Sequence, residues 1–300
     1  MNRNIIKIAQ TISRKVLSIP FLGFYAWRVV KYIREKLLID EEFVVTYDNN
    51  IKIRTNLDDH MESRIFWQGF LEGDRGEMLV LDEMLRNDKS QVFFDIGAHV
   101  GIFSLFAAKR IPDGRVHSFE PLEKHLKRIR SNIKLNSFNN ILVRSVIIGE
   151  KEGREDIHVP IPRKSDDPLN SGSGGTSIIP SKEDNSSHET YTIDKSTLDI
   201  YVKSNDIERI DIMKIDVEGA ELNVLNGARK SICRFRPHVL MELDKRYLNR
   251  AGKSVEELLD FWDQYDFSVY KIGNHGSLSR ITSASELNTR QNILADPGTT

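Results

Sequence analysis

Four acidic side chains stand where stretches of apolar, β-forming residues end. They are Asp95, Glu120, Asp216 and Glu242. A buried carboxylate without a partner costs several kcal/mol, so the needs of folding explain such a set poorly. Carboxylates accept hydrogen bonds from hydroxyl groups and attract cations. The four acids therefore indicate a binding site for a cationic or hydroxyl-rich ligand.

The first acid begins a loop that contains two glycines, Asp95-Ile-Gly-Ala-His-Val-Gly101. Gly97 and Gly101 permit close approach of the backbone to a ligand, but the loop lacks the full G-x-G-x-x-G spacing of a dinucleotide site. Glu120 follows Asp95 by twenty-five residues. An acid at about that distance, on the next strand, accepts hydrogen bonds from ribose hydroxyl groups. Together these features predict a nucleoside-containing cofactor without a pyrophosphate.

The segments that must position these side chains alternate between strands and helices. Strands are predicted at 92–94, 115–119, 141–148, 210–215, 238–241, 267–272 and 291–295. Helices are predicted at 77–85, 102–108, 123–135, 198–202, 222–233 and 255–265. This alternation predicts right-handed crossovers and a doubly wound α/β fold, whose mostly parallel seven-stranded sheet carries helices on both faces. Ligands bind beyond the carboxyl ends of such strands, where the acids are expected.

Three segments stand outside this alternation. Residues 43–47 and 51–54 flank turn-forming residues and predict a hairpin, which would be a small lid or entry element. Residues 160–189 combine four prolines with a Ser/Gly run, and predict either a flexible flap on the substrate side or a tolerated surface insertion. Residues 1–42 are predicted to form a basic amphipathic helical segment that precedes a single domain at 43–300.

The composition excludes several classes of protein. With 43 basic and 44 acidic residues the net charge is −1, so no global attraction to nucleic acid is expected. The single cysteine, Cys233, rules out an intrachain disulfide and an iron–sulfur cluster, and is typical of a reducing, cytoplasmic setting. The apolar stretch between Lys15 and Arg28 is too short to span a bilayer and precedes no cleavage site. Residues 1–38 would either contact a membrane surface peripherally or pack on the domain.

A series of motifs resembles the FkbM family of class I methyltransferases. The series comprises Asp95–Gly101, Phe119-Glu-Pro121, Asn132–Asn136, Lys214-Ile-Asp-Val-Glu-Gly-Ala-Glu221 and Val224-Leu-Asn-Gly-Ala228. The resemblance spans about residues 90 to 245. It rests most on the run that begins at Lys214, because the first loop alone is shared by many cofactor-binding folds.

The resemblance implies that S-adenosylmethionine binds over the first two strand ends. Gly97, Ala98 and Gly101 would line this cofactor, Asp95 would lie near its amino group, and Glu120 would accept from its ribose hydroxyls. Carboxylates suit its cationic sulfonium and amino groups. The implied reaction is methylation of a hydroxyl group on a sugar, glycolipid or secondary metabolite. The acceptor would be a small molecule or glycan and not a nucleic acid, since no Asn-Pro-Pro-aromatic segment follows the fourth strand.

Asp216 ends the strand expected beside the first one and is the predicted catalytic residue on the acceptor side. A carboxylate there would orient the hydroxyl group or remove its proton, and an ordinary pKa near 4 favours orientation. His99 is a second candidate base, for which packing or hydrogen bonding is the alternative role. Lys214 would be a structural counter-ion, with Asp95 and Glu242 as further acidic neighbours.

Other interpretations remain open from the sequence. Asp216 and Glu242 would hold a magnesium ion in a metal-assisted variant, although two acids make a thin site and the resemblance requires no metal. Glu218 and Glu221 would either cap the following helix or contact substrate. A non-catalytic module that binds a partner through residues 1–40 is an alternative function. An NAD-dependent dehydrogenase is a weaker alternative, because the glycine spacing argues against it.

Overall fold

The computed structural model describes residues 10–11, 42–48, 50–57, 59–69, 75–160 and 188–298. These residues fall into two compact units, a smaller one drawn from Met1–Gly73 and a larger one that holds the described residues from 75 onward. The predicted segment 1–42 lies almost wholly outside the described residues. Its separation from a domain at 43–300 therefore stays a prediction.

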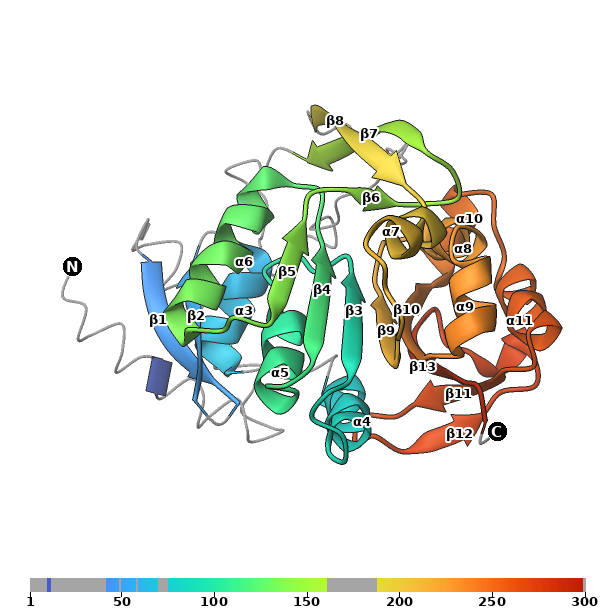
Figure 1. Ribbon diagram of the computed structural model, residues 1–300, viewed down its shortest axis with the longest axis horizontal. Coiled ribbons are helices and arrows are strands. Elements are labelled where there is room, and N and C mark those ends of the chain that lie inside the picture. The colour runs from blue at the N-terminus through green and yellow to red at the C-terminus, as the bar shows by residue number, and fades with distance from the viewer. Residues whose placement is uncertain are drawn as a thin grey trace. The chain divides into compact units, whose positions relative to one another are not determined.

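The larger unit is built on an eight-stranded mixed sheet with the order β12-β11-β13-β10-β9-β3-β4-β5 (Figure 1). Parallel pairing joins β3 (Val92–Ile96), β4 (Arg115–Phe119), β5 (Ile141–Arg144), β9 (Ile212–Ile215) and β10 (His238–Asp244). Antiparallel pairing adds β13 (Arg290–Asp296), β11 (Ser268–Ile272) and β12 (Leu278–Arg280). The predicted doubly wound, mostly parallel fold is confirmed. The short edge strand β12 is one strand more than the sequence predicts.

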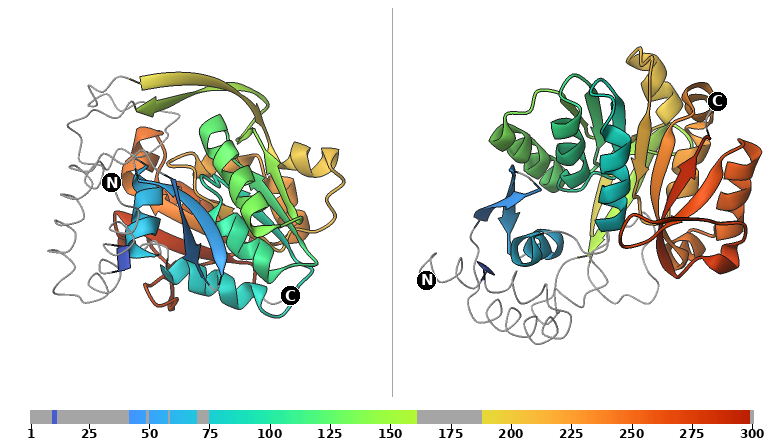
Figure 2. Two further views of the ribbon diagram at one scale, coloured as in Figure 1. Left: turned by 90° about the vertical axis from the view of Figure 1, so that its left-hand side faces the viewer. Right: turned by 90° about the horizontal axis from the view of Figure 1, so that it is seen from below.

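Helices cover both faces of this sheet. On one side of β3 the crossovers are α5 (Ile102–Arg110) and α6 (Glu123–Asn136). On the other side they are α8 (Glu221–Asn226) with α9 (Arg229–Phe235), and α11 (Val255–Gln264). Because the strand order reverses between β3 and β9, right-handed crossovers place the two sets on opposite faces (Figure 2). Three further helices are α4 (Arg75–Leu85), α7 (Leu198–Ser204) and α10 (Lys245–Arg250).

The core lies along the central strands. Phe93 and Phe94 in β3 and Met213 in β9 are fully buried, as continuous apolar strands covered on both faces should be. Trp262 of α11 is also fully buried. The burial of these side chains fixes the strands whose ends carry the acidic residues.

Two predicted elements are divided in the structure. The strand predicted at 141–148 is split into β5 and β6 (Ile147–Ile148), which leaves the main sheet to pair with β8 (His188–Ser196). The helix predicted at 222–233 breaks at Gly227, where a Cβ atom would lie 2.0 Å from the carbonyl oxygen of Gly149. That close approach of two backbones requires a glycine and ends α8.

The ends of the predicted flap form an antiparallel ribbon. β7 (Gly153–Pro160) pairs with β8 along its whole length. Residues 160, 188 and 189, which belong to the predicted flexible flap, therefore lie in paired strands. Backbone pairing thus continues a few residues into the segment that its prolines predict to be irregular. Residues 161–187 lie outside the described residues, so the flap itself stays a prediction.

The smaller unit contains the predicted hairpin. β1 (Glu42–Tyr47) pairs antiparallel with β2 (Ile51–Asn56), which confirms the hairpin but leaves its role as a lid untested. The sequence analysis misses α3 (His60–Gln68), which begins after Asp59, whose side chain accepts from the Glu62 amide at 3.0 Å. No helix in the described part of the chain is long and apolar enough to cross a bilayer.

Candidate functional site

The loops that follow β3, β4 and β9 gather at one edge of the main sheet. Ile96 is in register with Phe119 on one side and with Ile215 on the other. The amides of Gly97 and Ala98 both donate to the Phe119 carbonyl oxygen at 3.0 Å. These bonds tie the glycine loop to the neighbouring strand at the point where strand order reverses, where ligands bind in open α/β sheets.

Both predicted cofactor-binding glycines lie in the left-handed region of φ, at 87° for Gly97 and 86° for Gly101. A Cβ atom at Gly97 would lie 1.9 Å from the carbonyl oxygen of Asp216, and one at Gly101 would lie 3.2 Å from Ile129. Packing within the protein therefore already requires Gly97. That Gly97, Ala98 and Gly101 also line a cofactor stays a prediction.

Asp95 is held beneath this loop with only 1% of its surface exposed. Its carboxylate accepts from Ser104 Oγ at 2.5 Å, and Ser104 Oγ lies 2.8 Å from Ser118 Oγ. Burial raises the pKa of Asp95 to about 6, against the opposing attraction of Lys214. Asp95 thus anchors the first turn of α5 to β3. The sequence analysis misses this role because Ser104 sits unremarked in an apolar helix.

Glu120 follows β4 and is engaged by three donors. Its Oε2 accepts from the amide of His99 at 2.8 Å, while Oε1 accepts from the amide of Leu122 at 3.0 Å. His125 Nδ1 lies 3.1 Å from the same Oε1. A carboxylate can accept about four hydrogen bonds, and the contacts among the described residues are two to Oε1 and one to Oε2. Oε2 can therefore accept a further hydrogen bond. His125 is a site residue that the sequence analysis does not single out.

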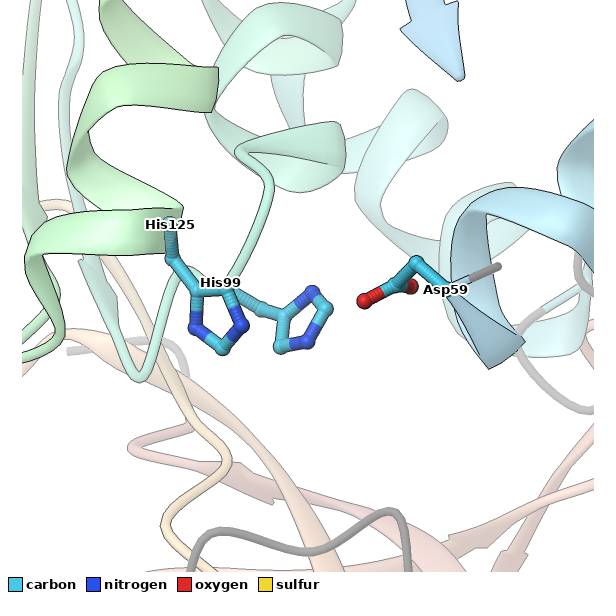
Figure 3. Close-up of side chains that lie close together, drawn as sticks. All are labelled: Asp59, His99 and His125. Carbon is cyan, nitrogen blue, oxygen red and sulfur yellow. The ribbon is translucent and has the colours of Figure 1, made fainter. Parts of the chain in front are cut away.

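His99 has a φ of 52°, an unfavourable conformation for a residue that carries a side chain. Its amide is held by Glu120, and its ring lies against that of His125, with the ring centroids 3.9 Å apart (Figure 3). Its electrostatic attraction also contributes to a lowered pKa of Asp216. His99 is thus hydrogen-bonded to Glu120 through its amide and acts electrostatically on Asp216, and its role as a base stays a prediction.

Lys214 and Asp216 form an ion pair at the end of β9. The Lys214 ammonium donates to Asp216 Oδ2 at 2.9 Å and lies 4.4 Å from the ring centroid of Phe103. Burial acts to raise the pKa of Asp216, but the attraction of Lys214 and its hydrogen bond prevail and hold that pKa below its ordinary value. Asp216 is therefore an ionised carboxylate at neutral pH.

Acidic neighbours keep Lys214 charged although it is buried. Burial lowers the pKa of the ammonium, but Asp216, Glu77 and Asp95 more than offset this and raise it above its ordinary value. The expectations for Asp216 and Asp95 as neighbours are confirmed. Glu77, which arrives from α4, is missed because α4 lies far away in sequence.

The expectation for Glu242 needs correction. β10 continues to Asp244, so Glu242 lies within the strand and not at its end. Its carboxylate pairs with Arg290, the first residue of the antiparallel partner β13. Arg290 pairs with Glu242 and Lys214 pairs with Asp216, so each acid already has a cationic partner, and the magnesium alternative stays untested.

Two further acids follow Asp216: Glu218 lies in the loop before α8, and Glu221 is the first residue of that helix. Glu221 Oε1 accepts from the amide of Gly219 at 2.9 Å, but α8 has no side-chain cap hydrogen bond, so the choice between capping and substrate contact for Glu221 stays open. Burial raises the pKa of Glu221 to about 7 and that of Glu218 to about 8. The charge of Asp216 contributes to the raised pKa of both groups.

Residues 95–269 match the family described as Methyltransferase FkbM domain. AMB antimetabolite synthetase AmbE of Pseudomonas aeruginosa is 29% identical over 204 residues, which cover 59% of this chain and 10% of that protein. Methyltransferase 1 of Beauveria bassiana is 24% identical over 198 residues, which cover 59% of this chain and 78% of that protein. A solved FkbM methyltransferase structure from Methylobacillus flagellatus matches with a TM-score of 0.45 and 16% identity, over 79% of this chain and 55% of that one. The matches thus span about a tenth of the first protein and about half of the solved chain.

Proposed function

Since this chain belongs to the FkbM methyltransferase family, we propose that it transfers a methyl group from S-adenosylmethionine to a hydroxyl group of a small molecule or glycan. The observation that carries the proposal is the position of two carboxylates on either side of β3. Glu120 follows one neighbouring strand and Asp216 follows the other. Glu120 suits the ribose hydroxyls of the cofactor, and Asp216 suits the hydroxyl group of the acceptor.

The residues of this edge fit the proposed cofactor. Glu120 retains an acceptor position on Oε2 for a ribose hydroxyl, next to the amide of His99. The backbone of Gly97, Ala98 and Gly101 would line the cofactor, and Asp95 would add negative charge from beneath the loop. When bound, S-adenosylmethionine supplies an electrophilic methyl group on a cationic sulfonium. The negative charge at this edge favours such a ligand over a pyrophosphate.

We assign Asp216 the role of orienting the acceptor. Its side chain is 30% exposed, so it is accessible to a hydroxyl group that approaches the edge. The ion pair with Lys214 keeps it ionised, and an ionised carboxylate accepts a hydrogen bond that fixes the direction of the hydroxyl oxygen. The same ion pair makes Asp216 a weak base, because a lowered pKa opposes uptake of a proton.

Calorimetric titration tests the cofactor assignment. We expect micromolar binding of S-adenosylmethionine and no binding of NAD. Glu120→Gln should weaken cofactor binding at least about ten-fold, because the glutamine side chain has only one acceptor oxygen and no negative charge to strengthen its hydrogen bond to a ribose hydroxyl. Glu152→Gln, at an exposed turn, is the matched control and should bind as the wild type does. Thermal melting of each variant would show whether Glu120→Gln stays folded.

Transfer of a labelled methyl group to a panel of sugars, glycolipids and phenolic alcohols tests the acceptor class. Asp216→Asn should lower the rate more than it lowers cofactor affinity, because it removes the charge that orients the acceptor; thermal melting checks that loss of the ion pair with Lys214 leaves the variant folded. Transfer to amines and not to hydroxyl groups would overturn the acceptor assignment. A folded protein that binds no S-adenosylmethionine would favour the non-catalytic module.

The basic N-terminal residues bear on where the acceptor is met. Residues 1–38 contain eight basic residues and one acidic residue, which favours peripheral contact of a cytoplasmic protein with an anionic membrane. A lipid-linked glycan would then be an accessible acceptor. Co-sedimentation with anionic vesicles that persists after deletion of residues 1–38 would contradict this part of the proposal.

A further inference from the structure

Glu218 is held in an unusual backbone conformation two residues beyond Asp216. Its φ is 50°, in the left-handed region, which costs about 1–2 kcal/mol for a residue with a side chain. The next residue, Gly219, has a φ of 105°, and a Cβ atom there would lie 2.8 Å from the carbonyl oxygen of Tyr247. Close packing of the loop against α10 therefore fixes Glu218 in place.

One carboxyl oxygen of Glu218 and one of Glu221 lack a hydrogen-bond donor among the described residues. Glu218 Oε2 is buried and has no hydrogen-bond partner among the described residues. Glu221 Oε2 is in the same state within the described ranges, although the Glu221 side chain is only 2% exposed. Buried polar atoms nearly always have partners, and the exceptions cluster at functional sites. Two such oxygens next to Asp216 point to a ligand that supplies hydrogen-bond donors.

The surroundings of Glu218 oppose its ionisation in the free protein. Burial raises its pKa most, and the negative charges of Asp216 and Glu221, close by in the chain, add to this. Arg290 from β13 lowers the pKa, while Asp244 from β10 raises it. The resulting pKa of about 8 means that most Glu218 side chains are protonated at pH 7.

Tyr247 completes the set of titratable groups that face Glu218. It lies on α10, and the charge of Glu218 contributes to a raised pKa of its phenol, after the larger effect of burial. A neutral phenol is a hydrogen-bond donor and not a competing base. Glu218 is therefore the group on this side of the site with the strongest tendency to take up a proton near neutral pH.

We propose that Glu218 is the catalytic residue that takes the proton of the acceptor hydroxyl, and that it ionises when the cationic cofactor binds. This inference rests on the proposed function. As the acceptor oxygen bonds to the methyl carbon, the carbon–sulfur bond breaks and its electron pair goes to sulfur. The hydroxyl proton moves to a Glu218 oxygen while Asp216 keeps the hydroxyl oriented. A base with a pKa near the working pH suits this task better than Asp216.

The coupling to cofactor charge distinguishes this role from a structural one. S-adenosylmethionine carries a sulfonium charge, whereas S-adenosylhomocysteine, the product, does not. A positive charge placed near a buried carboxyl group lowers its pKa by about one unit or more. Glu218 should then lose its proton when the methylated cofactor binds and keep it when the product binds.

Proton release measured by calorimetry tests the proposal without knowledge of the acceptor. Each ligand is titrated at pH 7.5 in phosphate and in Tris, whose ionisation enthalpies differ. Wild-type protein should release about half a proton or more per S-adenosylmethionine and almost none per S-adenosylhomocysteine. Glu218→Gln should bind S-adenosylmethionine within about three-fold of the wild type and release no proton. Glu152→Gln, at an exposed position, is the matched control and should keep the release, whereas Glu221→Gln tests whether the neighbouring carboxyl group is the source of the proton.

Each outcome decides between the assignments. Equal proton release by the wild type and Glu218→Gln would overturn the proposal. Loss of release in Glu221→Gln alone would assign the proton to Glu221 and overturn it as well. Binding of S-adenosylmethionine without any proton release refutes the role of Glu218 but leaves the proposed function standing. Failure of the folded protein to bind S-adenosylmethionine removes both.

Kinetics with an acceptor from the methyl-transfer panel test the catalytic step. Glu218→Gln should lower kcat by about 100-fold or more, because amides do not accept the proton, and should change the KM for S-adenosylmethionine by no more than about three-fold. In the wild type, kcat should rise with pH as Glu218 ionises in the complex. A Glu218→Gln enzyme with wild-type kcat would overturn the proposal.

Discussion

The Lys214 ammonium group donates to the Asp216 carboxylate across 2.9 Å, yet only 3% of the lysine side chain is exposed against 30% of the aspartate. The pair thus joins a cation inside the protein to an anion at the edge of the sheet. Because two further buried acids, Glu77 and Asp95, act on the same cation, Lys214 connects α4, β3 and β9 electrostatically. The charge of Lys214 therefore stabilises the buried acids and keeps Asp216 ionised.

Loss of the Lys214 charge should destabilise the protein strongly. In Lys214→Met the carboxyl groups of Glu77 and Asp95 stay buried without their cation, and we expect a loss of about 3 kcal/mol in the free energy of unfolding. Lys253→Met is the control, because Lys253 pairs with Glu257 at 3.7 Å on the surface and should contribute less than about 0.5 kcal/mol. Urea denaturation measures both changes. Similar small losses in the two variants would contradict the proposed importance of the buried charge.

Substitution of Gly97 should cost more than backbone strain alone. In Gly97→Ala the new Cβ atom would lie 1.9 Å from the Asp216 carbonyl oxygen, which forces the loop and the end of β9 apart. We expect a loss of about 3 kcal/mol or more in unfolding free energy. Gly252→Ala is the matched control, because Gly252 has a φ of 67° but nothing within 4 Å of its added Cβ. There the loss should be only about 1 kcal/mol. Equal losses by thermal or urea unfolding would show that the clash is relieved.

His117 should make the protein less stable in mild acid. Burial, together with Arg144 and Arg115, lowers its pKa from 6.5 to about 4. Between these values the unfolded chain binds a proton that the folded chain does not, so this group's contribution falls by up to about 1.4 kcal/mol per pH unit as pH drops. His117→Phe should lack this component. Tyr201→Phe is the control, since it removes the same 2.8 Å contact but keeps the titrating ring.

Urea unfolding of the wild type and both variants at pH 7.5, 6.5, 5.5 and 4.5 measures this effect. The difference between the wild type and His117→Phe should shrink or reverse toward pH 4.5. The difference between the wild type and Tyr201→Phe should change much less. Parallel curves for all three proteins would contradict the assignment of a neutral, buried His117.

Glu218 should make the stability of the protein fall as pH rises, which is opposite to the effect of His117. Its folded pKa of about 8 lies above the ordinary value of 4.5, so the stability it contributes is present below pH 4.5 and is lost as pH rises through 8. Glu218→Gln should therefore gain stability relative to the wild type across that window, by up to about 1.4 kcal/mol per pH unit. Glu256→Gln, at an exposed helical position, should follow the wild type. Denaturation at pH 5, 6.5 and 8 provides the measurement, and a gain that is equal at all three values would contradict it.

Local sequence patterns are sufficient to predict the fold class and the edge of the sheet that carries the candidate site. Apolar strands such as 92–94 and the helices between them follow from local periodicity and from residues that end elements, so they can be read without distant contacts. Glu120 and Asp216 follow strands whose carboxyl ends must meet in a parallel sheet, and Asp95, predicted to end the strand between them, is the last residue but one of β3. The same patterns do not predict the short elements α3, α10 and β12, whose apolar periodicity is weak.

Which charged groups come into contact depends on how distant segments pack in the folded chain. Glu77 reaches Lys214 from another helix, and Glu242 pairs with Arg290 because the antiparallel strand β13 brings that residue alongside an extended β10. The orphaned oxygen of Glu218 likewise depends on how its loop packs against α10. Local patterns fix where a strand ends, but the pKa of a carboxyl group is set by burial and by charges from distant segments. Those quantities exist only once the chain has folded.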